Sequence, residues 1–412
     1  MTRTVRSTAV LALALTLTFG AATASTADGS APDGSATRGG SAATGLRDVV
    51  LVGNSADGTV SFLDARTYRN LGILNVVPDL DEVLSGMGPI RRAAYEIVRQ
   101  QAGGDKFVDD AHLSPDGRTL YVSRGNLGDA AAYDVATGRQ VWRTHLAGFK
   151  ADHAALSADG RTLVVSAISA AKAQTLDTAT GAITGEFPTG TYPHENIYSA
   201  DGKLIYNMSI GVTSMPYALD FLKGTKQVTV VDAATLKVVR TYGFDKGVRP
   251  AVITRDGRTM YAQLSYLNGF VEYDLEAGRT VRTVEMPYSE AAAAMRRDDY
   301  PQNSAHHGMA ADAAEEKLCV AGTIDDYTAV VSRPGLTVDG YVHYPQGSLP
   351  YWAVTGPGGD HCWVTLSERD EVSVVDYRTA EEVARVKVGD FPQRERAGRV
   401  AEDALGGLRP QD

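Results

Sequence analysis

A short phrase recurs along the chain and constrains its fold more than any other feature. It reads Ser114-Pro115-Asp116-Gly117, returns at Ser157 and Ser199, and has looser copies that begin at Thr254, Ala310 and Thr355. The copies are about 42 to 56 residues apart, the length of one supersecondary unit. Such units stack into rings or arrays, so we expect equivalent positions to lie close together in space.

The clearest unit contains four β-rich runs separated by turns. These runs are Asp110 to Ser114, Thr119 to Ser123, Ala131 to Asp134 and Gln140 to Arg143. Short runs joined by Asp-Gly and Thr-Gly turns are typical of a four-stranded antiparallel sheet. The same order returns in later units, which predicts an all-β chain built from propeller blades.

Seven blades account for the chain. Six units have an inner strand, whereas the first, from Val49 to Val77, begins at its second strand. The segment that starts with Asp390 to Arg394 is the candidate for the missing strand. We therefore predict a seven-bladed β-propeller of four-stranded antiparallel blades, in which the C-terminal strand joins the first blade, closes the ring and removes exposed sheet edges.

The repeat resembles that of a known family. SPDGRTLYVS and YDVATGRQV, as they stand in this sequence, are similar to the YVTN-type β-propeller repeat over about residues 46 to 401. The resemblance implies the propeller fold. It implies no single function, because the family includes binding proteins, electron-transfer partners, lactone hydrolases and the streptogramin lyase.

The remaining segments suggest a secreted protein. Residues 1–24 combine Arg3 and Arg6, an apolar run and a small-residue cleavage site, as a secretory signal peptide does. Residues 25–45 are rich in Gly, Ser, Ala and Thr and are expected to be a flexible leader, and residues 402–412 a tail. The apolar run is too short to cross a bilayer, so we expect no membrane association.

Three insertions interrupt the propeller at residues 78–106, 209–226 and 287–303. The first contains an expected helix from about Ile90 to Ala102. All three fall in links on the face opposite the Asp-Gly turns. Long excursions from a compact ring are usually functional, so we expect them to cover the channel mouth.

Charge and cysteine content narrow the function further. The formal net charge of −10 argues against a nucleic-acid partner, because phosphate binding needs a basic face. Cys319 and Cys362 fall in corresponding strands of adjacent blades. An oxidising compartment favours a disulfide, and the alternative is two buried thiols.

Polar residues gather four and five positions before the repeated Ser. Aligning the units brings together, among others, Asp110, His153, His194, Glu195 and His306. Central strands are normally apolar, because burying an unpaired charge is costly. We therefore predict a divalent metal ion, Zn, Mn, Fe, Ni or Cu, held by His153, His194, His306 and Asp110. The alternative is a metal-free polar channel in which these groups bind each other and ordered water.

Other residues of this cluster face a substrate in the same interpretation. Arg249 and Arg394 match an anionic group, or else neutralise neighbouring carboxylates. Trp352 and Tyr351 stack on a sugar or aromatic ligand, or else pack between blades. Glu195 or His307 is the candidate base, and Tyr351 the candidate acid.

Two classes of function follow. The first is a secreted metal-assisted lyase or hydrolase that acts on an anionic or carbonyl-bearing small molecule or saccharide, with a copper oxidase as a variant. The second is a non-catalytic extracellular binding or scaffold protein. In either class we expect a monomer.

Overall fold

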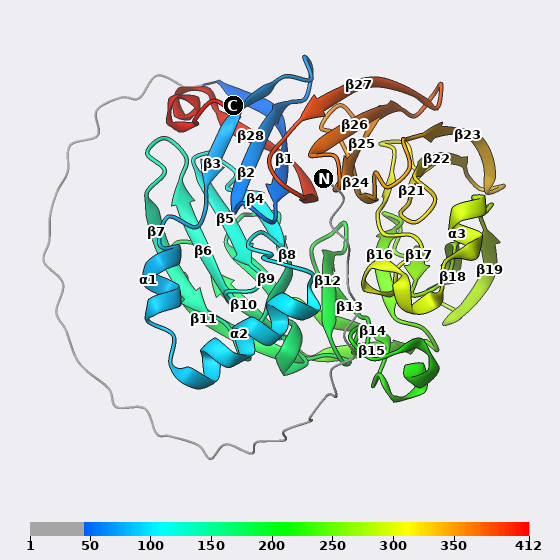
Figure 1. Ribbon diagram of the computed structural model, residues 1–412, viewed down its shortest axis with the longest axis horizontal. Coiled ribbons are helices and arrows are strands. Elements are labelled where there is room, and N and C mark those ends of the chain that lie inside the picture. Colours follow the sequence, from blue (N-terminus) through cyan, green and yellow to red (C-terminus); the bar gives the residue numbers. More distant parts are fainter. Residues whose placement is uncertain (1–44, 412) are drawn as a thin grey trace, which may run out of the picture. The chain divides into compact units, whose positions relative to one another are not determined.

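A computed structural model of the protein describes residues 45–411. The expected signal peptide and all but the last residue of the expected leader lie outside these residues. The described chain forms seven antiparallel sheets of four strands each, which confirms the predicted fold. Figure 1 shows the blades around a common axis, in the order of the sequence. The inner strands β28, β4, β8, β12, β16, β20 and β24 contact one another in turn around this axis.

Blade one combines both ends of the described chain. It contains β28 (Pro392–Ala401), β1 (Leu46–Asn54), β2 (Thr59–Asp64) and β3 (Asn70–Asn75). Blades two to four are β4–β7 (Asp110–Leu113, Thr119–Arg124, Asp129–Asp134, Gln140–His145), β8–β11 (Ala151–Leu156, Thr162–Ala167, Lys172–Asp177, Ile183–Pro188) and β12–β15 (Pro193–Tyr198, Leu204–Ser209, Gln227–Asp232, Val238–Gly243).

Blades five to seven repeat the pattern. They are β16–β19 (Val248–Ile253, Thr259–Leu264, Gly269–Asp274, Arg279–Glu285), β20–β23 (Met309–Ala311, Lys317–Gly322, Tyr327–Ser332, Thr337–His343) and β24–β27 (Pro350–Thr355, His361–Leu366, Glu371–Asp376, Glu381–Lys387).

The recurring phrase forms the turn between the first two strands of a blade. In blade two, the Ser114 hydroxyl accepts a hydrogen bond from Thr119 N at 2.9 Å and donates one to the Asp116 carboxylate. Gly117 has φ +68°, and a Cβ there would lie 2.5 Å from Ala401 N. Glycine is therefore required both for the turn and for the close approach of β28.

Ring closure follows the prediction. β28 pairs with β1 along its whole length, from Leu46 opposite Ala401 to Asn54 opposite Pro392. The expected tail is part of the packed structure. It forms the short helix η5 (Glu402–Gly407), and Arg409 then bridges to Ile73 of β3.

The core lies between neighbouring blades. Val49 and Phe62 of blade one, for example, pack in one cluster with Leu120 and Val122 of blade two. Blades six and seven are also joined covalently, by the disulfide between Cys319 of β21 and Cys362 of β25. The predicted disulfide is thus confirmed.

The three insertions carry most of the helical residues. Between β3 and β4 lie α1 (Leu80–Ser85) and α2 (Pro89–Gln101), and α2 corresponds to the expected helix. Between β13 and β14 lies η2 (Tyr217–Leu222). Between β19 and β20 lie α3 (Glu290–Ala294), η3 (Arg297–Asp299) and η4 (Pro301–Asn303), and η1 (Ile168–Ala170) follows β9. Among the described residues, every helix is too short or too polar to cross a membrane.

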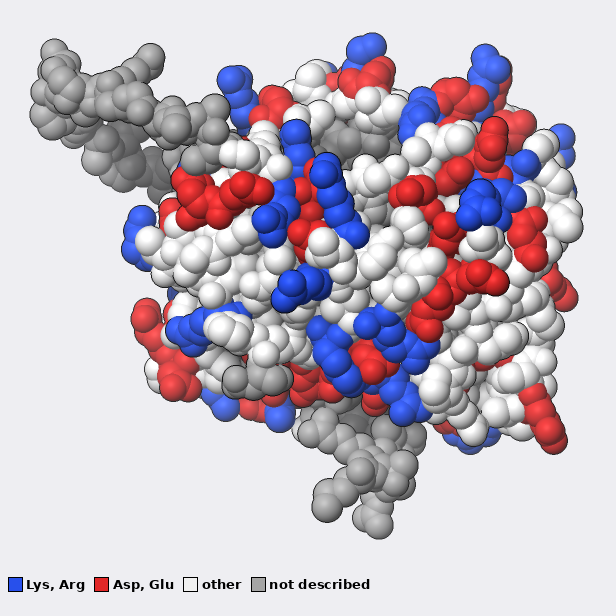
Figure 2. Space-filling model, turned by 90° about the horizontal axis from the view of Figure 1, so that it is seen from above, with Lys and Arg blue, Asp and Glu red and all other residues white. Residues whose placement is uncertain are grey.

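The insertions meet at Gln302. Its amide nitrogen donates to the Gln101 carbonyl at 3.2 Å, and its amide oxygen accepts from the Thr213 hydroxyl at 3.2 Å. One residue of the third insertion therefore contacts both of the others. On the side of the ring seen in Figure 2, basic and acidic side chains are interspersed, and neither sign forms a continuous surface.

Candidate functional site

A backbone hydrogen bond marks the same turn in six blades. It joins Ser114 N to Thr119 O at 2.8 Å, and it recurs from Ser157, Ser199 and Thr254. In blade six it starts at Asp312, and in blade seven at Gly356. The sequence alignment placed the turn at Ala310 and Thr355. It was therefore shifted by two residues in blade six and by one residue in blade seven.

The corrected register produces two rings of side chains around the axis. Five positions before the turn lie Asp109, Asp152, His194, Arg249, His307 and Tyr351, and Gln393 of β28 completes this mouth ring. The next positions form an inner ring of Asp110, His153, Glu195, Pro250, Gly308, Trp352 and Arg394. In several blades the pairing shifts at this point, so that two residues of the inner strand face one of its neighbour. Such bulges re-aim side chains, and they are common next to functional sites.

A chamber of about 100 Å³ lies at the mouth ring. Six of the seven mouth-ring residues line it, all except His307, together with Arg394, Lys106 and Lys150. The C-terminal end of α2, with Val98 and Gln101, and Gln302 also line it. All three insertions thus line the channel mouth, as expected, because the second insertion also contributes Thr213 to the chamber.

Two histidines face each other beside this chamber. The Nε2 atoms of His194 and His307 are 3.2 Å apart. On its other side, His194 Nδ1 lies 3.3 Å from an Asp152 carboxylate oxygen, and His307 Nδ1 lies 3.1 Å from the Tyr351 carbonyl oxygen. An ionised carboxylate and a carbonyl can only accept hydrogen bonds, so each Nδ1 must carry the proton. Both Nε2 atoms therefore present lone pairs to each other.

The surroundings keep these rings neutral. Burial, with Arg394 and Arg249 nearby, lowers the pKa of His194 to about 4 in spite of the Asp152 contact. Burial, with Arg394 and His194, also holds the pKa of His307 well below its usual value. Burial alone would raise the pKa of Asp152, but Lys150 and His194 outweigh it and keep that carboxylate ionised. At neutral pH a bridging proton between the two rings is thus disfavoured.

His153 completes a group that could hold a metal ion. One candidate ligand atom from each of Asp152, His153 and His194 lies within 4.8 Å of the others, and all three residues are buried. The His153 and His194 ring centroids are 4.0 Å apart. Arg394 Nη2 contacts His153 Nε2, however, and His153 Nδ1 has no hydrogen-bond partner among the described residues.

Arginine and lysine side chains give the chamber a positive character. Arg249 and Arg394 are almost fully buried, and Lys106 nearly so. Lys150 pairs with Asp109 at 2.9 Å and lies 3.8 Å from Asp152. Both arginines that the sequence suggested for an anion thus line the chamber, and two lysines accompany them.

Three predicted site residues of the inner ring have structural partners. Asp110 forms two hydrogen bonds with Arg396, at 2.7 and 2.9 Å, and also accepts from Ala154 N. Glu195 accepts a hydrogen bond from Ala251 N at 3.1 Å, and burial raises its pKa to about 7. Each carboxylate thus ties its blade to a neighbouring one. The Trp352 indole donates to the Glu395 carbonyl at 3.1 Å and is only 2% exposed, which indicates packing.

His306 lies apart from the other histidines. Its Nε2 is 3.0 Å from the Tyr327 hydroxyl. The register correction explains the difference, because it moves His307, and not His306, into the ring of His194. Tyr351 of the same ring stacks on His307 with ring centroids 4.1 Å apart.

Sequence reasoning missed Lys106, Lys150 and Gln302. Each belongs to a link between blades, outside the aligned positions, so the repeat gave no signal for it. Lys150 stands two residues before Asp152, and this Lys-x-Asp-His run is the one local feature that could have drawn attention to it.

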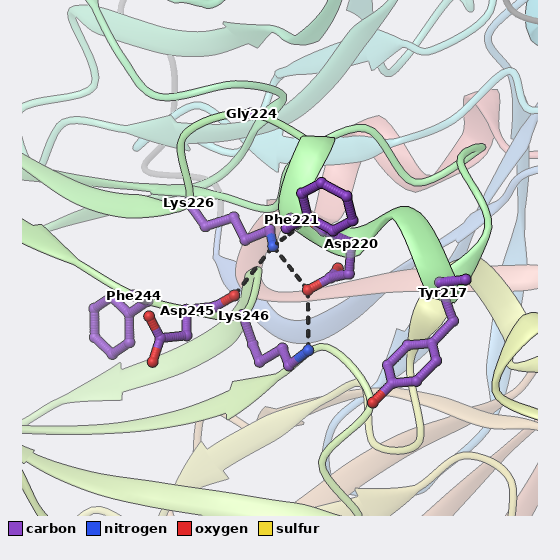
Figure 3. Close-up of a pocket in the computed structure, with 9 residues that line it drawn as sticks. Tyr217, Asp220, Phe221, Gly224, Lys226, Phe244, Asp245 and Lys246 are labelled. Atoms are coloured by element: carbon purple, nitrogen blue, oxygen red, sulfur yellow. Dashed lines mark hydrogen bonds and ion pairs between the residues drawn. The ribbon is translucent and has the colours of Figure 1, made fainter.

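A second, open hollow lies beside the insertion between β13 and β14. Figure 3 shows Lys226 and Lys246 directed at Asp220, with nitrogen to oxygen distances of 2.8 and 3.0 Å. The carboxylate is therefore neutralised by its own neighbours. This cluster anchors the insertion to the link after β15.

Comparison with known proteins supports the fold. No protein-family model and no curated sequence matches the chain. The structure is similar to Kuenenia stuttgartiensis hydrazine synthase, with a TM-score of 0.56, 17% sequence identity, and coverage of 69% of this chain and 88% of that one. At this identity the likeness concerns the fold alone. Membership of the YVTN-type family stays a prediction.

Proposed function

We propose that the protein is a secreted metal-dependent enzyme, a lyase or hydrolase, that acts on a small organic anion in the channel-mouth chamber. One observation carries the proposal, namely the pair of Nε2 lone pairs of His194 and His307 at 3.2 Å. Two nitrogens bound to one zinc-like ion at about 2.0–2.1 Å lie roughly 2.9 to 3.4 Å apart, depending on the angle. The observed separation fits two ligands of one ion.

The donor set favours particular metals. Imidazole nitrogens with a nearby carboxylate suit Zn, Mn, Fe, Ni or Cu. The contacts of both Nδ1 atoms with oxygen acceptors match the second layer of contacts that normally orients metal-bound histidines. His194 and His307 would hold the ion through Nε2, and Asp152 would orient His194. A bound divalent ion would polarise a carbonyl or carboxylate group of the substrate.

The protein's own side chains would bind and orient the substrate. Arg249 offers a guanidinium group to an anionic group on the chamber wall. The Tyr351 hydroxyl makes no hydrogen bond among the described residues, although Tyr351 lines the chamber, so it is free to donate a proton. The insertions would exclude bulk water, which strengthens these polar contacts.

Metal analysis of the purified protein tests this proposal. We expect about one ion per chain in the wild type, and its loss in His194→Ala and His307→Ala. His343→Ala, on the exposed outer strand β23, is the matched control. His153→Ala separates two positions of the ion, because it removes a ligand only if the ion binds beside Asp152 and His153.

Each outcome decides a point. Loss of metal from the His194 and His307 variants alone supports the Nε2 position. Loss from the His153 variant with retention in His307→Ala would place the ion at the opposite edge of His194. The proposal would be overturned if protein produced in metal-containing medium were folded, contained no metal and had the same stability in chelator. The result would favour a metal-free binding protein.

A further inference from the structure

Three buried cations of the chamber have no carboxylate partner among the described residues. Arg249 donates to the Ser265 hydroxyl at 3.1 Å and to the Gln302 carbonyl. Arg394 donates to the Gln393 carbonyl at 2.8 Å and contacts His153, while its Nε has no hydrogen-bond partner in the part of the chain that the structure describes. Lys106 Nζ lies 3.1 Å from the centroid of the Phe391 ring.

The acidic residues of the chamber compensate these charges only in part, because two carboxylates, Asp109 and Asp152, line it together with four cations. Asp109 and Asp152 are shared by a fourth cation, Lys150. Burial lowers the pKa of Lys106 to about 8 and that of Arg249 to about 10, so both remain charged at neutral pH. Buried charges are normally paired, and these line a cavity, so the missing partner is expected to be an anionic ligand.

The unpaired cations form two groups on opposite sides of the axis. Arg249 belongs to β16 of blade five. Arg394 belongs to β28 of blade one, and Lys106 lies just before β4 of blade two. In a ring of seven, blade five stands opposite the junction of blades one and two. A ligand that satisfies both groups must carry a negative charge at each end.

The chamber also limits the size of this ligand. Its volume of about 100 Å³ is well below the roughly 300–1,000 Å³ of sites for drug-sized molecules. A saccharide is therefore too large to fit within the chamber. A dicarboxylate of two to four carbons in total remains.

We propose that the chamber binds a small dicarboxylate, with one carboxylate at Arg249 and the other at Arg394 and Lys106. This inference rests on the proposed function only in that both concern the same chamber. It narrows the small organic anion proposed there to one chemical class. Arg249 offers a planar fork that matches a carboxylate, and Lys106 adds a point charge at the far end.

Isothermal titration calorimetry with acids of equal length tests the inference. Succinate is compared with butyrate, and malonate with propionate, on the full chain at constant ionic strength. We expect each dicarboxylate to bind at least about tenfold more tightly than its monocarboxylate, which corresponds to about 1.4 kcal/mol. Equal affinities within each pair, or no binding of either acid, would overturn the inference.

Substitutions assign the two ends. Lys106→Gln should weaken succinate binding more than butyrate binding and so remove most of the preference for dicarboxylates. Arg249→Gln should weaken both classes, and Arg249→Lys should restore part of the loss. Lys203→Gln, at an exposed lysine on a turn, is the matched control. If Lys106→Gln weakened the binding of dicarboxylates and monocarboxylates equally, the assignment of the second carboxylate would be wrong. The comparison of acids on the wild-type protein tests the inference even if a variant does not fold.

Titrations before and after chelator treatment separate the two proposals. A dicarboxylate preference that persists in metal-free protein supports this inference even if the protein binds no metal. A metal-loaded protein with no such preference contradicts this inference alone.

Discussion

His194 of blade four and His307 of blade six bring their Nε2 atoms to 3.2 Å, although the residues are 113 positions apart in the sequence. Blade five, which lies between them, contributes Arg249 to the same ring. Each imidazole is fixed from behind, one by a carboxylate and the other by a backbone carbonyl. The fold thus directs two imidazole nitrogens at one point, where we propose that a metal ion binds.

Asp152 is expected to tune the metal affinity without being essential for it. Asp152→Asn should weaken metal binding by about 10- to 100-fold, because contacts that orient a metal-bound histidine typically contribute that much. Competition with a chelating dye measures the change. Asp201→Asn, at an exposed turn carboxylate, is the control.

Two other results would change this view. Complete loss of metal in Asp152→Asn would make Asp152 a direct ligand. An unchanged affinity would contradict its contact with His194 as a determinant of the site.

His306 is expected to make the protein sensitive to acid. It is fully buried, and burial lowers its pKa from 6.5 to about 3. Below pH 6.5 the unfolded chain takes up a proton that the folded protein refuses, so stability falls as the pH drops toward the folded pKa. The slope reaches about 1.4 kcal/mol per pH unit for one such group.

Denaturant unfolding of metal-free protein at pH 7 and pH 5 checks this expectation. His306→Gln should lose less stability than the wild type between these values, while the other buried histidines contribute equally to both. If the wild type and His306→Gln lost the same free energy of unfolding between pH 7 and pH 5, His306 would not titrate as expected.

The ring could be predicted from the sequence because its signals are local and repeated. The Ser114 hydroxyl, the Asp116 carboxylate and the φ of Gly117 together define a turn, and each can be read from residue type. The number of turns predicted the number of blades. Because the first unit lacks an inner strand, the sequence also predicted that the C-terminal segment, β28, supplies it. The disulfide between Cys319 and Cys362 could be predicted for the same reason, because equivalent strands of adjacent blades lie side by side.

The site was harder to predict because blades six and seven use other chemistry for the turn. In blade six the Asp312 carboxylate replaces the serine hydroxyl and accepts from Lys317 N at 2.9 Å. Glu315, with φ +56°, takes the place of the glycine. This turn has no recognisable phrase, so the alignment slipped and selected His306. The contacts of Lys106 and Gln302 depend on how the insertions fold, which no repeat encodes.

The ion pair between Asp110 and Arg396 is expected to hold blades one and two together. Burial would raise the pKa of Asp110, but Arg396 and His112 more than offset this and hold it far below its usual range. Arg396→Met would leave the buried Asp110 carboxylate without its guanidinium partner, and breaking a buried pair in this way typically costs about 3–5 kcal/mol. Denaturant unfolding at pH 7 measures this loss.

A double variant provides the control for this pair. Asp110→Asn combined with Arg396→Met removes both charges and should recover part of the stability. If the single variant were as stable as the wild type, the pair would not contribute to cohesion between the blades.

The disulfide is expected to stabilise the ring where blades six and seven meet. It closes a loop with a sequence separation of 43 residues, for which the chain-entropy model gives about 4 kcal/mol. Both cysteines are fully buried, so Cys319→Ala with Cys362→Ala also removes sulfur atoms from a packed interface. We expect denaturant unfolding of this double variant to show a loss of stability of at least that size.

Wild-type protein under reductant should lose less stability, because it keeps both sulfur atoms. If it unfolded at an unchanged denaturant concentration while thiol titration counted two free cysteines, packing between the blades would be sufficient without the covalent link.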